Sequence, residues 1–147
     1  MVKKLTASDV CLVTGYSRDE LHALLRVLPP YHFVKSAPRV ARAFTAKDLL
    51  VLSVTHILED RYGVRRAALA DIGVPLQELI AGPRMQCEDP CLLINIRPPS
   101  VRLVDTIAPK EGLMLPLAPL YEKIDTYLSY DPQLSLQFGP MLVRKYG

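Results

Sequence analysis

Residues 5–26 constrain the fold more than any other stretch of this chain, because they predict two short helices joined by a tight turn. Gly15 stands where such a turn needs a positive backbone φ, which glycine adopts without steric cost. The small side chain of Cys11 lies four residues before it, and Leu21 lies six residues after it. This spacing lets two helices cross closely with a small side chain at the contact. It indicates a helix-turn-helix, a motif whose second helix enters the DNA major groove.

The beginnings of both helices carry capping signals. Thr6 is followed three residues later by Asp9, and Ser17 by Glu20, so each pair can form a reciprocal capping box. Apolar pairs flank both caps at the spacing of a hydrophobic staple: Leu5 with Val10, and Tyr16 with Leu21. We therefore expect one helix to begin after Thr6 and the next to begin after Ser17.

The second predicted helix has an apolar face and a polar face. Its apolar residues follow the spacing of a core-facing stripe: Leu21, Leu24, Leu25 and Leu28. The opposite side carries the candidate DNA-binding residues Ser17, Arg18, Asp19, His22 and Arg26. The structural alternative is an amphipathic helix whose polar face meets only water.

Each side chain of the polar face suits a particular contact with DNA. Arg18, near the start of the helix, can grip guanine O6 and N7, and His22 lies one turn further along the same face. Arg26 at the far end suits a phosphate, as do the Ser17 hydroxyl and the amides of the first turn. Asp19 can accept a hydrogen bond from cytosine, or it can orient Arg18.

Residues 31–43 predict a short basic hairpin after the second helix. Residues 31–34 contain strand formers, residues 36–38 suit a turn, and residues 39–44 suit the return strand. A basic hairpin beside a recognition helix is a wing, whose cations would meet phosphates or the minor groove: Lys35, Arg39 and Arg42. The alternative is a hairpin whose charges are simply solvated.

Residues 44–83 predict further helices. Phe44, Thr45 and Asp48 repeat the capping pattern before an apolar stripe that runs to Asp60, and Gly63 is a natural end. Residues 65–72 predict a fourth short helix that Gly73 interrupts. Pro75 can then begin a fifth helix, which Gly82-Pro83 closes.

The order of these elements resembles the winged DNA-binding domain of the MerR family over about residues 5–73. Such domains typically show Arg-x-Tyr followed by Ser or Thr where the wing enters the third helix, and this chain has Arg42-Ala43-Phe44-Thr45. Phe44, the proline-rich join at Pro29-Pro30 and a longer wing depart from that pattern. The resemblance implies a winged helix-turn-helix fold that binds double-stranded DNA.

The C-terminal half departs from MerR regulators, because nothing in it sustains their long dimerising helix. Residues 91–96, 101–107 and 112–115 predict short strands, with a loop at residues 98–100 between the first two. Residues 117–128 predict an amphipathic helix, and residues 134–146 a last strand. Several large side chains here suit a homodimer contact: Met114, Tyr121, Tyr127, Tyr130 and Met141. The alternative is that this half packs back onto the N-terminal half.

Charge and composition limit the function classes. Lys and Arg outnumber Asp and Glu by 12 to 8 in residues 1–84, whereas residues 85–147 hold 6 against 7, so the basic excess accompanies the helix-turn-helix. No apolar run is long enough for a membrane span, and the N-terminus lacks the apolar core of a signal peptide, so we expect a cytoplasmic, nucleoid-associated protein.

The sequence offers no constellation for catalysis. It contains no Ser/His/Asp set, metal-binding His pair, Walker loop or GxGxxG motif, and His32 and His56 are expected to be structural. The three cysteines are too few and unevenly placed for a disulfide framework or a zinc site, although Cys87 and Cys91 leave a redox or metal sensor as a minor alternative. We expect no enzyme, no cofactor and no metal.

Together these patterns predict an α+β chain with a MerR-like winged-helix domain in residues 1–84 and a small mixed α/β region for dimerisation or partner binding in residues 85–147. The predicted function is that of a sequence-specific transcription regulator. Two alternatives remain open: an excisionase-like architectural or recombination factor, and a protein-interaction adaptor on a helix-turn-helix scaffold.

Overall fold

The computed structural model describes residues 5–31, 43–84, 87–105 and 111–129, and every structural statement concerns these residues. Within them the chain has a mixed α+β fold, as predicted, with five helices and a three-stranded antiparallel sheet. The helices are α1 (Ala7–Thr14), α2 (Arg18–Val27), α3 (Ala46–Tyr62), α4 (Arg66–Ala81) and α5 (Ala118–Ser129). The strands are β1 (Pro90–Ile96), β2 (Pro99–Asp105) and β3 (Leu113–Pro116).

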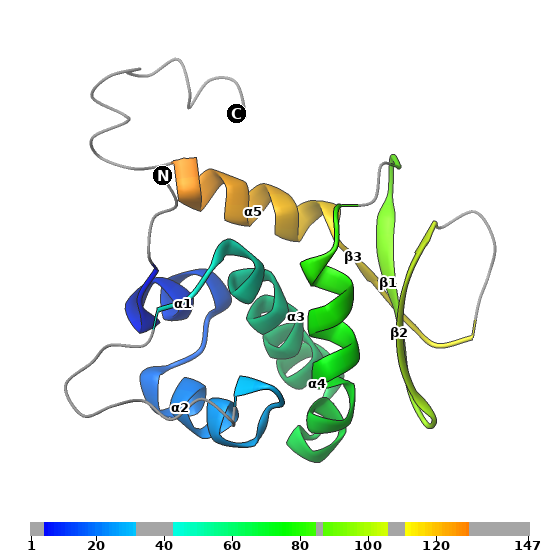
Figure 1. Cartoon of the computed structure of the whole chain (residues 1–147), viewed down its shortest axis with the longest axis horizontal. Helices are drawn as coiled ribbons and strands as arrows, with labels where there is room; N and C mark the ends of the chain where they lie inside the picture. Colours follow the sequence, from blue (N-terminus) through cyan, green and yellow to red (C-terminus); the bar gives the residue numbers. More distant parts are fainter. Residues whose placement is uncertain (1–4, 32–42, 85–86, 106–110, 130–147) are drawn as a thin grey trace.

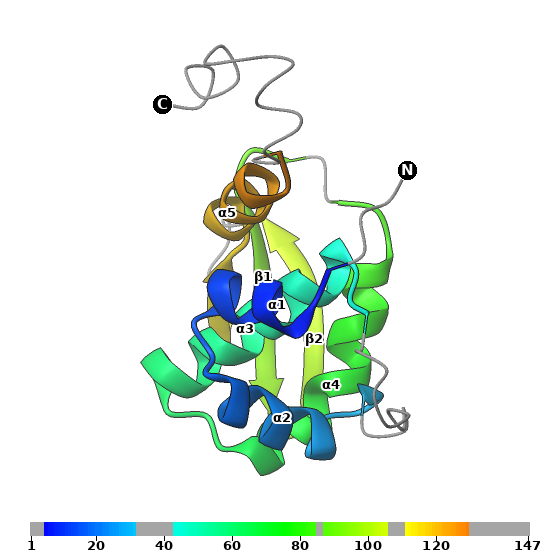
Figure 2. The ribbon, with the colours of Figure 1, turned by 90° about the vertical axis from the view of Figure 1, so that its left-hand side faces the viewer.

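The helices form one side of the molecule and the sheet forms the other. Figure 1 shows α1 and α2 on the left, α3 and α4 in the middle, and the sheet on the right. α4 packs against β2, α3 packs against both α4 and α1, and α5 packs against α3. In Figure 2 the molecule is turned so that α1 and α2 face the viewer, with α5 above them. One face of α2 therefore lies at the edge of the molecule that is farthest from the sheet.

The first three helices begin where the sequence predicts. Thr6, Ser17 and Thr45 each cap a helix in a reciprocal box, with Asp9, Glu20 and Asp48 as the partners. Gly15 ends α1 with a φ of 94°, in the left-handed region that favours glycine. Three residues thus separate α1 from α2, and this short link fixes the angle at which α2 leaves α1.

The predicted break at Gly73 is wrong, because α4 runs without interruption from residue 66 to residue 81. Gly73 is buried within it, and an added Cβ would collide with the carbonyl oxygen of Pro29. Glycine is therefore needed for close approach of the chain after α2, and not to end a helix. Pro75 also lies inside α4, where it cannot donate a backbone hydrogen bond to the Asp71 carbonyl.

The two described ends of the predicted wing do not form hairpin strands. Tyr31 lies in no strand, and its hydroxyl donates to Asp48 Oδ1 at 2.6 Å. Phe44 pairs instead with Leu5 in an isolated antiparallel bridge, with Phe44 N donating to the Leu5 carbonyl at 2.9 Å. This bridge ties the beginning of α1 to the beginning of α3. Residues 32–42, and with them the rest of the predicted wing, lie outside the described residues.

The sheet has the order β2-β1-β3, with β1 in the centre. Leu92 lies opposite Leu103 and Leu115, and these residues face the helices in the main hydrophobic core. Leu93 faces the other way and packs with Cys91, Val104 and Met114. A central strand that is buried on both faces requires a continuous apolar run, which residues 91–94 supply.

The predicted loop between the first two strands is shorter than expected. Pro99 and Ser100 belong to β2, so only Arg97 and Pro98 separate it from β1. The strand predicted at residues 134–146 lies outside the described residues.

The described C-terminal residues pack onto the N-terminal half. Leu92, Leu115 and Ile124 share one hydrophobic cluster with residues of α1 to α4. The Tyr127 hydroxyl donates to Asp9 Oδ1, and the Arg84 guanidinium stacks over the Tyr121 ring with 4.2 Å to the ring centroid. Three of the side chains that suited a dimer contact, Met114, Tyr121 and Tyr127, thus make contacts within the chain, and Tyr130 and Met141 lie outside the described residues.

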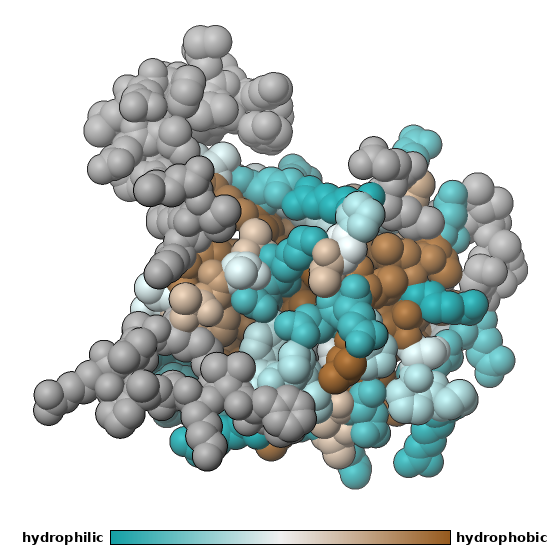
Figure 3. Space-filling view, in the orientation of Figure 1, coloured by the Kyte–Doolittle hydropathy of each residue, from teal (hydrophilic) through white to brown (hydrophobic). Residues whose placement is uncertain are grey.

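The described surface is mixed in character. Figure 3 shows polar residues over much of one face, with apolar residues visible mainly over the strands and beside α5. None of the described helices has both the length and the apolar character needed to cross a membrane.

Candidate nucleic-acid interface

The five candidate DNA-binding residues predicted for the second helix lie on the exposed side of α2. Ser17, Arg18, Asp19, His22 and Arg26 are all exposed, whereas Leu21, Leu24, Leu25 and Leu28 are buried. The apolar stripe of this helix therefore faces the core, and its polar side is turned outward. Lys35, Arg39 and Arg42, the three cations of the predicted wing, lie outside the described residues.

The turn before α2 is packed tightly against α3. An added Cβ at Gly15 would lie 3.0 Å from the His56 ring, so a larger residue would have to displace this ring in addition to adopting the positive φ of 94°. The ring of Tyr16, the next residue, meets the His56 imidazole edge to face, with 4.7 Å between ring centroids. The partly buried His56 ring therefore supports the turn through its contacts with Gly15 and Tyr16.

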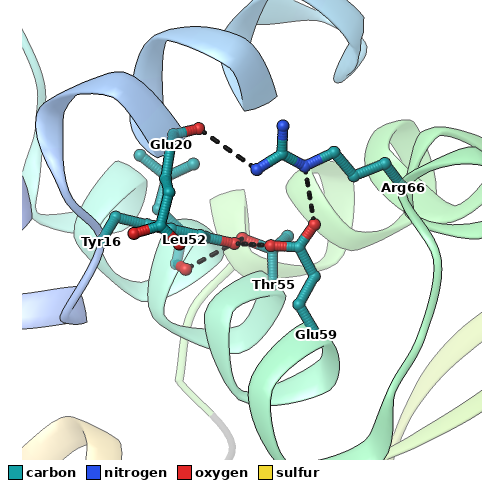
Figure 4. Close-up of polar contacts among 6 residues, drawn as sticks. All are labelled: Tyr16, Glu20, Leu52, Thr55, Glu59 and Arg66. Atoms are coloured by element: carbon teal, nitrogen blue, oxygen red, sulfur yellow. Dashed lines mark hydrogen bonds and ion pairs between the residues drawn. The ribbon is translucent and has the colours of Figure 1, made fainter.

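A polar network behind this turn fixes the first turn of α2 (Figure 4). The Tyr16 hydroxyl donates to Glu59 Oε2 at 3.0 Å and lies 3.2 Å from Thr55 Oγ1. Thr55 gives its own proton to the Leu52 carbonyl at 2.9 Å. Arg66 Nε donates to Glu59 Oε1 at 2.9 Å, and Arg66 Nη2 reaches the Glu20 carbonyl oxygen at 3.4 Å. The network therefore connects α2 to both α3 and α4.

The electrostatics of the network favour neutral Tyr16 and ionised Glu20. Burial of the Tyr16 hydroxyl raises the pKa of this group far above its ordinary value of 10.0, and the nearby Glu59 carboxylate adds to the shift. Hydrogen bonds from the Ser17 side chain and backbone lower the pKa of Glu20 below its ordinary value of 4.5. Both protonation states keep the described hydrogen bonds in place at neutral pH.

Arg18, the predicted reader of guanine, is held by α1. Its Nη2 donates to Ser8 Oγ at 2.6 Å, so the guanidinium lies across the outer side of the two-helix unit. The prediction offered Asp19 as a residue that orients Arg18, but the described partner is Ser8. Ser17 Oγ accepts from the Glu20 amide at 3.1 Å, and its own proton serves the Glu20 carboxylate, so the Ser17 hydroxyl is used within the capping box.

Two arginines that the sequence did not single out lie beside α2. The bond between Arg66 and the Glu20 carbonyl places the beginning of α4 next to the first turn of α2. Arg65, the residue before α4, is exposed there. The sequence signal that could have indicated these cations is the pair Arg65-Arg66, which stands at the beginning of α4. Glu59 neutralises Arg66 through their ion pair, and the two arginines of α2 are balanced by its two acidic residues, so Arg65 is the cation that this region adds beside α2.

The described residues offer no metal centre. No group of three or more His, Cys, Asp or Glu side chains among them could hold a metal ion. Cys11, Cys87 and Cys91 are free thiols, and burial raises the pKa of Cys91 above its ordinary value of 9.0.

No protein-family model, curated protein or solved structure matches this chain. The MerR-like resemblance over about residues 5–73 therefore stays a prediction from residues and spacing.

Proposed function

We propose that this protein is a sequence-specific DNA-binding transcription regulator of the winged helix-turn-helix type. In this proposal the exposed side of α2 enters the major groove, and the cations Lys35, Arg39 and Arg42 contact the DNA backbone. The supporting observation is that Ser17, Arg18, Asp19, His22 and Arg26 are exposed together on a helix whose other side is buried. A recognition helix needs this combination of an open polar face and a fixed position.

The arrangement of cations supports the same proposal. Arg18 lies near the beginning of α2, where base-reading side chains of recognition helices are found, and Arg26 lies in its last turn. Arg65 is exposed and directly precedes Arg66, whose side chain reaches the first turn of α2, so Arg65 is available for a phosphate of the same DNA segment. We therefore assign base contact to Arg18 and phosphate contact to Arg26 and Arg65.

Two further features belong to this proposal. A homodimer would double the small interface that one recognition helix offers and would read two half-sites. Its contact would have to use surfaces other than Tyr121 and Tyr127, which already pack within the chain. DNA binding would place the protein in the cytoplasm, on the nucleoid.

The test begins with selection of bound duplexes from random DNA, followed by anisotropy titrations of the full chain at several salt concentrations. Arg18→Ala should weaken binding by about 1–3 kcal/mol and relax specificity at one base pair. Arg26→Ala should weaken binding to all DNA sequences alike, and it should reduce the slope of log affinity against log salt concentration by about one. Arg102→Ala is the matched control, because Arg102 is an exposed arginine on the distant strand β2. Equal binding by all three variants would refute the assignment of this face.

DNA bending is the measurement that separates a regulator from an excisionase-like architectural factor. A large bend in circular-permutation assays, without a preferred operator, would favour the architectural role.

A protein-interaction adaptor is the second candidate, and one observation favours it. Leu12 on α1 is 73% exposed, so the two-helix unit offers an apolar side chain beside the polar face of α2. Together with the balanced charges of α2, this side chain suits a protein partner. Failure of the chain to bind DNA or heparin at low salt would favour this candidate.

A further inference from the structure

A small apolar cavity lies where the two halves of the chain meet. It has a volume of about 200 Å³ and is lined by residues of α3, the end of α4, β2 and α5. Figure 2 shows the beginning of α3 between α5 and the end of α4, which is where these elements converge. The lining is mainly aliphatic and aromatic: Leu50, Ile80, Leu103, Leu117, Tyr121 and Ile124.

Two cations line the same cavity, Lys47 from α3 and Arg84 after α4. Lys47 Nζ donates to the carbonyl oxygens of Ala81 and Gly82, so one of its three N–H groups remains for another acceptor. Arg84 donates from Nη1 and Nη2 to the Asp125 carboxylate at 2.8 and 2.7 Å, which leaves three of its five N–H groups. The charged groups at the cavity are the cations Lys47 and Arg84 and the Asp125 carboxylate that binds Arg84, so the net charge of these three side chains is positive.

The position of Arg84 makes it part of the cavity wall. Its guanidinium carbon lies over the Tyr121 ring, 4.2 Å from the ring centroid, and Asp125 binds the guanidinium from the next turn of α5, with both side chains of this ion pair about half exposed. The unused donors of Arg84 therefore lie at the solvent-exposed side of the cavity.

We infer that this cavity binds a small carboxylate with a single-ring or branched apolar body. The apolar lining would take the body of the ligand, and Lys47 and Arg84 would take the carboxylate. The size is adequate, since a dry apolar cavity of about 150 Å³ holds benzene. The structure favours an anion over a neutral molecule of the same shape, because the remaining N–H groups of Lys47 and Arg84 would form stronger, charge-assisted hydrogen bonds with a carboxylate than with an amide oxygen.

Benzoate and phenylacetate are the probes, with benzamide and phenylacetamide as neutral counterparts of the same size. Titrations of the full chain by calorimetry and by NMR should give saturable binding of at least one carboxylate, with a Kd on the order of 1 mM or below, as expected for so few atoms. The neutral counterpart should bind at least about tenfold more weakly, as expected for the loss of a charge-assisted hydrogen bond. Absence of saturable carboxylate binding, or equal binding of the amide, would overturn the inference.

Two pairs of variants locate the site. Ala46→Phe adds a ring into the cavity and should abolish binding, whereas Ala67→Phe adds the same ring at an exposed position of α4 outside it. Lys47→Met should weaken carboxylate binding, while Lys123→Met, on the exposed side of α5, should not. Circular dichroism confirms that each variant is folded. Binding that is the same within each pair would place the ligand elsewhere and refute the site. These binding experiments do not depend on DNA, so they test the inference separately from the proposed function.

Discussion

Replacing Tyr16 by phenylalanine removes one hydroxyl from the network behind α2 and keeps the aromatic ring. Tyr16 is 3% exposed, and its hydroxyl contacts Glu59 Oε2 at 3.0 Å and Thr55 Oγ1 at 3.2 Å. A hydrogen bond to a charged acceptor contributes about 1.5–3 kcal/mol. Glu59 keeps its ion pair with Arg66, and Thr55 keeps its bond to the Leu52 carbonyl, so neither partner is left alone. We therefore expect Tyr16→Phe to lower the free energy of unfolding by about 1.5 kcal/mol, the lower end of this range.

The assay is denaturation of the full chain in urea, followed by circular dichroism, together with a thermal melt. For a chain of this size the expected loss lowers Tm by about 3–6 °C. Tyr62→Phe is the matched control, because Tyr62 is 51% exposed at the end of α3 and should change little. If Tyr16→Phe and Tyr62→Phe have the same stability within about 0.3 kcal/mol, the buried network does not hold α2 in place.

Two further predictions concern the surroundings of α2. Gly73→Ala should cost about 1–3 kcal/mol in chemical denaturation, because its Cβ would collide with the Pro29 carbonyl, whereas Gly82→Ala has more room and should cost much less; equal losses would contradict the close approach. Ser17→Ala should raise the pKa of Glu20 towards 4.5 in an NMR titration, since Ser17 donates the hydrogen bonds that lower it. In the parent chain the stabilisation linked to ionised Glu20 is present above pH 4.5 and is lost as pH falls through the lower folded pKa of Glu20. The Ser17→Ala variant keeps the backbone donor, so it should lose only the side-chain part of this acid dependence. An unchanged Glu20 pKa would refute the assignment.

Local rules were sufficient to predict how the first three helices begin. The cap at Ser17, for example, involves Glu20 only three residues away, so both partners can be read from one short stretch. The left-handed turn at Gly15 is similarly local, since its backbone conformation depends mainly on the absence of a side chain. The α+β class followed from apolar runs that alternate with helical periodicity.

Contacts between distant residues were not predictable in the same way. A glycine such as Gly73 can mark a helix end or a close crossing, and only the position of Pro29, 44 residues earlier in the sequence, decides between them. The pairing of Tyr16 with Glu59 spans 43 residues, and that of Tyr127 with Asp9 spans 118. No periodicity of a single helix signals such partners, because they depend on how helices pack.

The most direct test of the central claim is an NMR map of the full chain bound to a selected DNA duplex. The account predicts saturable binding, with the largest amide shift changes in residues 17–26 and near Arg65, and little change on the strands β1 and β2. Saturable binding with shifts confined to the strands or to α5, or no binding to any selected duplex at low salt, would contradict it.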